Sequence, residues 1–244
     1  VEGPQAVREL ARFRPGAVRD VYVREDAWVT HADIVEAAQS ATRWVHPVTA
    51  EVSAALSRDS QGVCAVASAD AVSRELPEPS VGETLVVLAQ GRDPGNVGTI
   101  IRTADAFGAV GVITVSGTVE ATSPKVVRAS AGSVFHIPVC IVPSFEEAHA
   151  LIHRRSAALL GTSGGVGSLD LSQMLAQGVS GRSRLSQSHA WVFGNEAKGL
   201  SGAEMRLCDA LVSIPMTGDA ESLNVASAAT ACLFASQTVR GMAL

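Results

Sequence analysis

Apolar positions along the chain follow two periods, one typical of helices and one typical of strands. In the first 68 residues, this spacing predicts a small α/β unit. Its predicted helices are 4–13, 31–41 and 49–56, and its predicted strands are 18–23 and 62–68. Residues 69–82 contain two prolines and several charges without a clear period, as is typical of a linker or an ordered connecting arm.

From residue 84 onward the alternation continues with stronger strands. The apolar runs that we interpret as strands are 84–90, 111–117, 137–142, 157–163, 190–195 and 210–216. Most of them are followed by a helical pattern, and this alternation predicts a mainly parallel sheet with helices on both faces. Because ligands of such sheets bind at the carboxyl ends of the strands, polar residues there are candidates for a site.

Composition and charge limit the class of protein. The 244 residues are 47% hydrophobic, which is enough for a substantial core. A net charge of -5 argues against a protein that coats nucleic acid non-specifically, although a local basic patch remains possible. Only two of the 19 basic residues are lysines, so phosphate recognition would use mainly arginine.

Cysteine spacing and hydropathy exclude two further classes. The four cysteines lie far apart with no histidine at zinc spacing, so we expect reduced thiols and no metal. The chain shows no basic-then-apolar leader and no apolar run near the roughly 20 residues that span a bilayer. We therefore expect a cytoplasmic protein without a membrane segment.

The first polar strand end is followed by the sequence GRDPGNVGTIIRTADAFG, residues 91–108. A turn from Asp93 to Asn96 leads into a predicted helix whose apolar stripe starts at Val97 and leaves Arg102 off the core face. Taken alone, this segment favours an N-cap asparagine and a solvated arginine.

The second polar strand end has the sequence WVFGNEAKGLS, residues 191–201. The strand ends at Gly194, where a bare backbone permits close approach, and Asn195, Glu196 and Lys198 follow before Gly199. A ligand-binding loop fits this pattern, and so does a plain helix entry with Glu196 in the first turn.

The third polar strand end has the sequence IPMTGDAESLNVASAAT, residues 214–230. Pro215 ends the strand, and Ser222 can cap a helix over 223–239, which exposes Ser222 and Asn224 where helix amides are free to meet a ligand. The helix is small or apolar nearly all round, so we expect it to be buried, against a second subunit. A cap and a core helix explain the helix but not the loop before it.

Together and in this order, the three segments resemble the SpoU/TrmH family of RNA ribose 2′-O-methyltransferases, within the knotted SPOUT class. Asn96 and Arg102 match the family's first motif, GNEAKGL at 194–200 matches the second, and IPMTGDAESLNV at 214–225 matches the third. Residues 1–68, with EGPQAV near their start, resemble the ribosomal-protein-like RNA-binding domain that many members carry in front.

The resemblance implies an α/β fold in which a small RNA substrate-binding domain (1–68) and a linker (69–82) precede a methyltransferase domain (83–244). That domain would be a trefoil-knotted, mainly parallel sheet. The resemblance also implies S-adenosyl-L-methionine as cofactor, ribosomal or transfer RNA as substrate, and a homodimer whose catalytic site takes residues from both subunits. It implies cofactor contacts at Thr162, Ser163, Gly194, Asn195, Glu196, Ile214, Met216 and Leu223.

The catalytic residues implied by the resemblance are Asn96, Arg102, Glu196, Ser222 and Asn224. Because a guanidinium resists deprotonation, we interpret Arg102 as binding the adjacent phosphate and stabilising the alkoxide, while the proton passes to a phosphate oxygen, water or Glu196. A non-catalytic RNA-binding adaptor with the same fold stays open as an alternative. A dehydrogenase does not fit, because GRDPGNVG lacks the G-x-G-x-x-G pattern.

Overall fold

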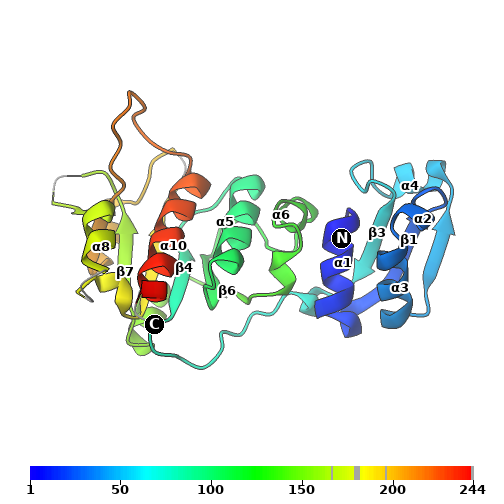
Figure 1. The fold of residues 1–244 in the computed structure, drawn as a ribbon, viewed down its shortest axis with the longest axis horizontal. Helices are drawn as coiled ribbons and strands as arrows, with labels where there is room; N and C mark the ends of the chain where they lie inside the picture. Colours follow the sequence, from blue (N-terminus) through cyan, green and yellow to red (C-terminus); the bar gives the residue numbers. More distant parts are fainter. Residues whose placement is uncertain (166, 179–181, 196, 243–244) are drawn as a thin grey trace.

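The computed structural model describes residues 1–165, 167–178, 182–195 and 197–242 (Figure 1). Within these residues the strands form two sheets. The smaller sheet has the order β2-β1-β3 and consists of β1 (Val18–Arg24), β2 (Val45–Val48) and β3 (Val63–Ala67). β1 pairs in parallel with β2 and antiparallel with β3.

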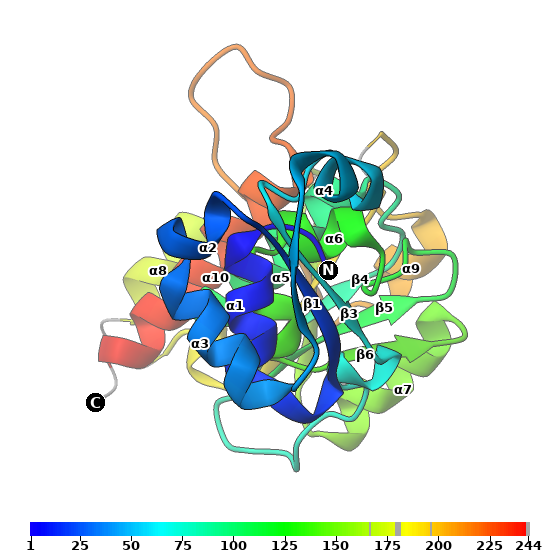
Figure 2. The ribbon, with the colours of Figure 1, turned by 90° about the vertical axis from the view of Figure 1, so that its right-hand side faces the viewer.

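Helices α1 (Pro4–Phe13) and α3 (Ala32–Ala41) cover one face of the small sheet. The unit also contains α2 (Ala27–Thr30) and α4 (Ala50–Leu56). Figure 2 shows α1 and α3 on one side of β1 and β3. The three predicted helices and two predicted strands of this unit are confirmed, but β2 was not predicted. Its sequence, VHPV, has no apolar alternation and contains a proline, which normally argues against a strand.

The larger sheet has the order β6-β5-β4-β9-β7-β10-β8, and its strand pairs are parallel. The strands are β4 (Thr84–Leu88), β5 (Gly111–Val115), β6 (Val139–Val142), β7 (Ala158–Thr162), β8 (Leu169–Asp170), β9 (His189–Phe193) and β10 (Ala210–Ser213). β4, β5 and β9 are buried along their whole length, which explains their continuous apolar runs. The predicted parallel sheet is therefore confirmed.

Helices flank this sheet on both faces. They are α5 (Pro94–Ala106), α6 (Pro124–Ala129), α7 (Phe145–Arg154), α8 (Leu171–Gly178), α9 (Gly202–Leu207) and α10 (Val225–Met242). The chain also contains short 3-10 turns: η1 (Pro15–Ala17) in the small unit, η2 (Ala69–Ala71) after β3, η3 (Ser133–Phe135) after α6 and η4 (Arg184–Ser186) before β9. None of the described helices is long and apolar enough to span a bilayer.

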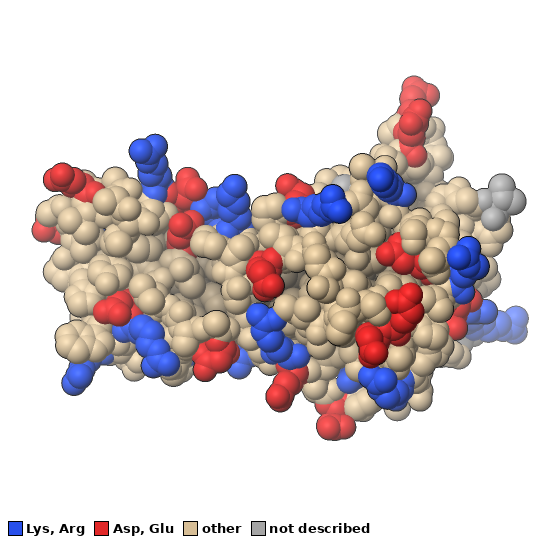
Figure 3. All heavy atoms as spheres, turned by 180° about the vertical axis from the view of Figure 1, so that it is seen from behind, with Lys and Arg blue, Asp and Glu red and all other residues tan. Residues whose placement is uncertain are grey.

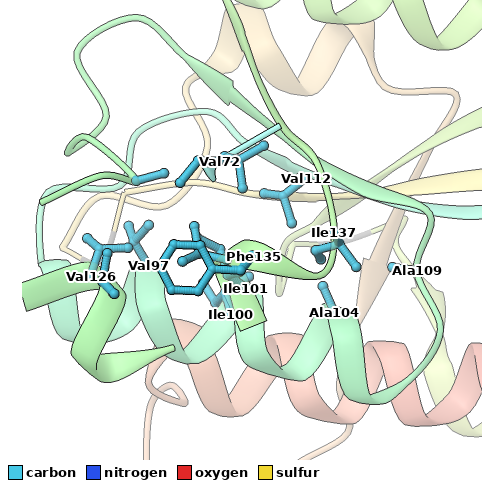
Figure 4. Packing of buried hydrophobic residues seen from close by; sticks show 14 of the residues in the cluster. Val72, Val97, Ile100, Ile101, Ala104, Ala109, Val112, Val126, Phe135 and Ile137 are labelled. Carbon is cyan, nitrogen blue, oxygen red and sulfur yellow. The ribbon is translucent and has the colours of Figure 1, made fainter. Parts of the chain in front are cut away.

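Alternating residues of β4 divide the core into two layers. Val86 packs in the cluster that includes α5 and α10, whereas Val87 packs with α7. In the first layer, the predicted stripe of α5, from Val97 to Ala104, is buried against Phe135 and its neighbours (Figure 4). The prediction of helices on both faces is confirmed.

The C-terminal helix begins later than predicted. α10 starts at Val225, and Asn224 Oδ1 accepts hydrogen bonds from the amides of Ala226 (2.8 Å) and Ser227 (3.4 Å). The prediction that Ser222 caps this helix was wrong, because Ser222 lies in the loop before it. An asparagine at this position satisfies the amides that the helix start leaves free.

Only one side of α10 is buried within this chain. Its inner face packs on α5, α8 and β9, and Ser236 Oγ accepts a hydrogen bond from Trp191 Nε1 (2.8 Å) and lies 2.7 Å from His189 Nε2. Burial lowers the pKa of His189 to about 4, so the imidazole is neutral in the folded protein. Phe234 on the outer face is 53% exposed.

The segment before β4 is an ordered arm held by a buried ion pair. Arg155 donates from Nε and Nη2 to the carboxylate of Glu83 (2.7 and 2.8 Å) and from Nη1 to the carbonyl of Pro77 (2.8 Å). Burial alone would raise the pKa of Glu83, but hydrogen bonds from Arg155 and Ser80 outweigh it and lower that pKa. Loss of either partner would leave a buried charge unpaired, which is costly, so the pair stays formed. It therefore holds the arm against the larger sheet.

The two units share a packed joint, with α1 on the side of the small unit that faces the larger one (Figure 1). His136 of the larger unit lies between Glu9 of α1 (3.1 Å) and Asp105 of α5 (2.8 Å). Arg14 donates to the carbonyl of Phe135 (3.0 Å), and one hydrophobic cluster contains residues of both units.

Candidate active site at the carboxyl ends of the strands

A cleft of about 470 Å³ lies at the carboxyl ends of β7, β9 and β10. Its lining includes seven residues predicted as cofactor contacts: Thr162, Ser163, Gly194, Asn195, Ile214, Met216 and Leu223. The eighth, Glu196, was also predicted as catalytic and lies outside the described residues. Segments between Thr162 and Leu223 that are separate in sequence thus meet in one cleft, at the edge of the sheet where the strand pattern predicted ligands.

The loop after β9 is closed by its own backbone. Asn195 N donates to the carbonyl of Gly199 (3.0 Å), Gly199 N donates back to the carbonyl of Asn195 (2.8 Å), and Asn195 Oδ1 accepts from the amides of Ala197 (3.0 Å) and Lys198 (3.2 Å). Gly199 has a φ of +66°, which favours glycine.

The structure gives a physical reason for glycine at position 194, where we predicted that a bare backbone permits close approach. In the structure, a Cβ atom on Gly194 would lie 2.4 Å from the carbonyl carbon of Gly199 and 2.5 Å from Leu200 N. The chain itself is the close neighbour, so Gly194 is needed to close the loop that forms one wall of the cleft.

Two hydrogen bonds join the strand ends beneath the cleft. Thr162 Oγ1 donates to the carbonyl of Val192 (2.9 Å), and Ser163 N donates to the carbonyl of Val212 (3.0 Å). They link β7 to both of its neighbours in the sheet. These bonds connect the strands at the base of the cleft, and residues 214–224, which have no regular secondary structure, supply a further part of its lining.

This loop, residues 214–224, projects from the body of the protein (Figures 1 and 2). It brings Met216 and Leu223 to the cleft, although their side chains are 44% and 43% exposed. Large apolar side chains that line a cleft and stay partly exposed are suited to cover an apolar part of a ligand.

Two predicted catalytic residues meet at the starts of α5 and α10. Asn224 Nδ2 donates to Asn96 Oδ1 (3.0 Å) across 128 residues of sequence. The expected role of Asn96 as an N-cap was wrong, since Asp93 Oδ1 caps α5 by accepting from Asn96 N (2.7 Å). The side chain of Asn96 is thereby free to pair with Asn224.

The two other predicted catalytic residues in the described part of the chain are Ser222 and Arg102. Ser222 lines the cleft. Arg102 is exposed on α5, off the core stripe as predicted, and is not among the described residues that line the cleft.

Sequence reasoning missed the apolar wall of the cleft. Its members are Phe193, Leu200, Met205, Val212 and Val225. Most of them stand inside or beside the motifs, but their apolar character made them look like core residues. Lys198, whose amide closes the β9 loop, also lines the cleft and supplies a cation there.

Neither metal nor thiolate chemistry is indicated by the described residues. No group of three or more potential metal ligands occurs among them. Burial, followed by the charges of Asp209 and Glu204, raises the pKa of Cys208 to about 12, and burial also raises the pKa of Cys232. These two thiols, one half-buried and one buried, are therefore protonated.

Comparison with known proteins gives consistent similarities. The family model described as the SpoU rRNA Methylase family matches residues 83–234. The chain is 32% identical to the 23S rRNA (guanosine-2′-O-)-methyltransferase RlmB of Bordetella pertussis over 243 residues, which cover 96% of this chain and 94% of that protein. It is 42% identical to the 23S rRNA (uridine(2479)-2′-O)-methyltransferase of Streptomyces viridochromogenes over 146 residues, which cover 58% of this chain and 47% of that protein.

A solved structure shares the whole architecture. The crystal structure of the SpoU methyltransferase AviRb from Streptomyces viridochromogenes, in complex with the cofactor AdoMet, has a TM-score of 0.76 and 29% sequence identity to this chain. The match covers 99% of this chain and 89% of that one, so it includes the small N-terminal unit.

Proposed function

Because the chain belongs to the SpoU rRNA methylase family, we propose that it transfers a methyl group from S-adenosylmethionine to a ribose 2′-hydroxyl of ribosomal RNA. The chain is an S-adenosylmethionine-dependent RNA 2′-O-methyltransferase, like the relatives that match it over nearly their whole length. The observation that carries this conclusion is the cleft, in which two of the three motif segments, 194–200 and 214–225, meet residues 162–164 at the strand ends.

The cleft fits the cofactor in size and chemistry. Its volume of about 470 Å³ lies within the roughly 300–1,000 Å³ of typical ligand pockets. Apolar side chains alternate with backbone groups of strand ends, which can bind an adenosine. We assign its binding to Thr162, Ser163, Gly194, Asn195, Ile214, Met216 and Leu223, and to Glu196, which the structure does not describe. When bound, the cofactor supplies an electrophilic methyl group.

The protein's own contribution is orientation and charge. Alignment of the ribose hydroxyl with the methyl donor accounts for much of the rate of such a displacement. Asn96 and Asn224, whose side chains share a hydrogen bond, and Ser222, which lines the cleft, would together hold the ribose. Arg102 binds the neighbouring phosphate and stabilises the alkoxide, and the proton leaves to a phosphate oxygen, water or Glu196.

We also propose that the active form is a homodimer. Arg102 lies outside the cleft of its own chain, and a second copy would supply it. The exposed ring of Phe234 on α10, edge-on to Phe107 at 6.0 Å, supports an apolar contact near α5. Light scattering measures the mass directly, and a monomer that methylates RNA at the normal rate would overturn this assignment.

Three further parts of the proposal concern the fold and the place of action. β10 lies between β7 and β8, so the connection between those two strands must pass it, which supports a C-terminal trefoil knot. The unit 1–68 would select the RNA, and 83–244 would hold the cofactor. We place the activity in the cytoplasm because ribosomal RNA is there.

A methylation assay tests the function. Purified protein, radiolabelled cofactor and deproteinised ribosomal or transfer RNA are incubated, and mass spectrometry of RNA fragments locates the label. We expect one or a few ribose 2′-O-methyl groups in ribosomal RNA. A protein that binds RNA but transfers no methyl group to any of these RNAs would instead be a non-catalytic adaptor.

A further inference from the structure

Three aromatic side chains form a row on the small sheet, far from the cleft in sequence. Tyr22 on β1 and His46 on β2 are partners in the strand register, and their rings stack with centroids 5.0 Å apart and an interplanar angle of 23°. The ring of Trp44, just before β2, lies 6.3 Å from that of His46 at an angle of 16°. The three rings are thus nearly parallel.

The row lies on the side of the sheet opposite α1 and α3. On β1, Val21 and Val23 are fully buried toward these helices, so the alternation of a strand turns Tyr22 to the other face. Trp44 is 51% exposed. A large aromatic side chain left half in water, with its neighbours already aligned, is available to bind a flat partner.

Two charged side chains contact the aromatic row, one at Trp44 and one at His46. The guanidinium carbon of Arg43 lies 4.7 Å from the centroid of the Trp44 ring, in a cation–π contact. His46 Nε2 lies 2.9 Å from Asp20 Oδ1, which fixes the orientation of the imidazole. The contact of Arg43 is made by a long, exposed side chain, so it can open and then close over an inserted ring.

The distribution of charge favours stacking over general phosphate attraction. Seen from behind, basic and acidic side chains are intermingled over both parts of the molecule, without a broad basic surface (Figure 3). With a net charge of -5, the protein has little general attraction for RNA. A base stacked on an aromatic ring is a local contact that does not depend on net charge.

We propose that Trp44, His46 and Tyr22 form a stacking surface for an unpaired base of the RNA substrate, and that Arg43 closes over this base. This inference rests on the proposed function, because it names the part of the RNA that the small unit recognises. An unpaired base in a loop or bulge exposes the flat face that this row requires, whereas a base inside a duplex does not.

The test compares RNA affinity with cofactor affinity and turnover. Trp44→Ala is expected to weaken binding of a ribosomal RNA fragment about tenfold, while Trp44→Phe stays within about threefold because it keeps a ring. The affinity for the cofactor, measured by calorimetry, and the methyl-transfer rate at saturating RNA should stay unchanged. Val29→Ala is the matched control, because Val29 is an apolar side chain of the same unit that is 83% exposed on α2.

Two further measurements separate stacking from a structural or electrostatic role. A single-stranded oligonucleotide should quench tryptophan fluorescence in the native protein and much less in Trp44→Phe. Arg43→Ala should weaken RNA binding because the group that closes over the base is lost, whereas Trp44→Ala should leave the salt dependence of RNA binding unchanged.

Unchanged RNA affinity in Trp44→Ala would overturn the inference, and so would a loss of affinity equal to that of Val29→Ala. If Trp44→Ala bound RNA normally but failed to retain a protein partner, the surface would serve protein contacts and the inference would be wrong. These results are independent of the proposed function, which fails only if the native protein methylates no RNA.

Discussion

One added methyl group at Gly194 should nearly abolish cofactor binding, although nothing of the cofactor need touch that position. In Gly194→Ala, the new Cβ would lie 2.4 Å from the carbonyl carbon and oxygen of Gly199, where ordinary contacts begin at about 3.4 Å. The backbone of the loop must therefore move by about 1 Å. That movement disrupts the pair of hydrogen bonds between Asn195 and Gly199.

The size of the effect follows from these contacts. Each backbone hydrogen bond contributes about 1 kcal/mol net, and overpacking costs about 1–3 kcal/mol. If the cofactor binds only the native arrangement of the loop, about 3 kcal/mol is lost from its binding free energy. This corresponds to a dissociation constant roughly 100-fold higher.

Calorimetry with S-adenosylmethionine measures this change, and thermal unfolding followed by circular dichroism shows whether the variant is folded. Gly164→Ala is the matched control, because Gly164 lines the same cleft and a Cβ there would meet no atom within 4 Å. Equal affinity in the native protein and Gly194→Ala, or equal losses in both variants, would refute the reasoning.

The other predictions concern catalysis, helix capping and pH. Arg102→Ala should lower turnover at least 100-fold and leave cofactor affinity within about threefold, whereas Arg154→Ala, an exposed arginine on α7, should change neither in turnover assays and calorimetry. Asn224→Ala should lower the unfolding free energy in urea by about 1–2 kcal/mol, because α10 loses its cap; an unchanged value would contradict the capping role. Because burial lowers the pKa of His189 from 6.5 to about 4, the unfolded state binds a proton that the folded state excludes. The contribution of His189 to the unfolding free energy should therefore be fully present above pH 6.5, and about 3 kcal/mol of it should be lost as the pH falls to 4. His189→Gln should remove most of this dependence of the unfolding free energy on pH, whereas His153→Gln should not.

Local periodicity predicted the elements that are buried in a regular way. The stripe of α5 and the apolar runs of β4 and β9 are visible in the sequence because each is buried along its length. β2 is not visible, because an edge strand with Pro47 needs few apolar residues and gains its stability from pairing with β1. The start of α10 was misplaced by two residues, since both Ser222 and Asn224 are good caps and only the path of the loop selects between them.

The resemblance to the family motifs predicted the candidate site, whereas the spacing of hydrophobic residues did not. Nothing local indicates that Asn96 and Asn224, which are 128 residues apart, share a hydrogen bond. The reason for Gly194 also depends on a fold of the loop that the sequence alone does not reveal. Contacts of this kind depend on the path of the chain through the whole fold. Hydrophobic periodicity indicates only which side of each helix or strand is buried.

The joint between the two units sets a length. His136 held between Glu9 and Asp105, and a core that runs through both units, leave the small sheet little freedom to swing relative to the cleft. If the small unit grips one nucleotide, the cleft can reach only those riboses that lie at one fixed separation from it in the folded RNA. The protein would then choose its target as a ruler does, and one base pair inserted between the two points in the RNA would move the methyl group to a different nucleotide or prevent its transfer.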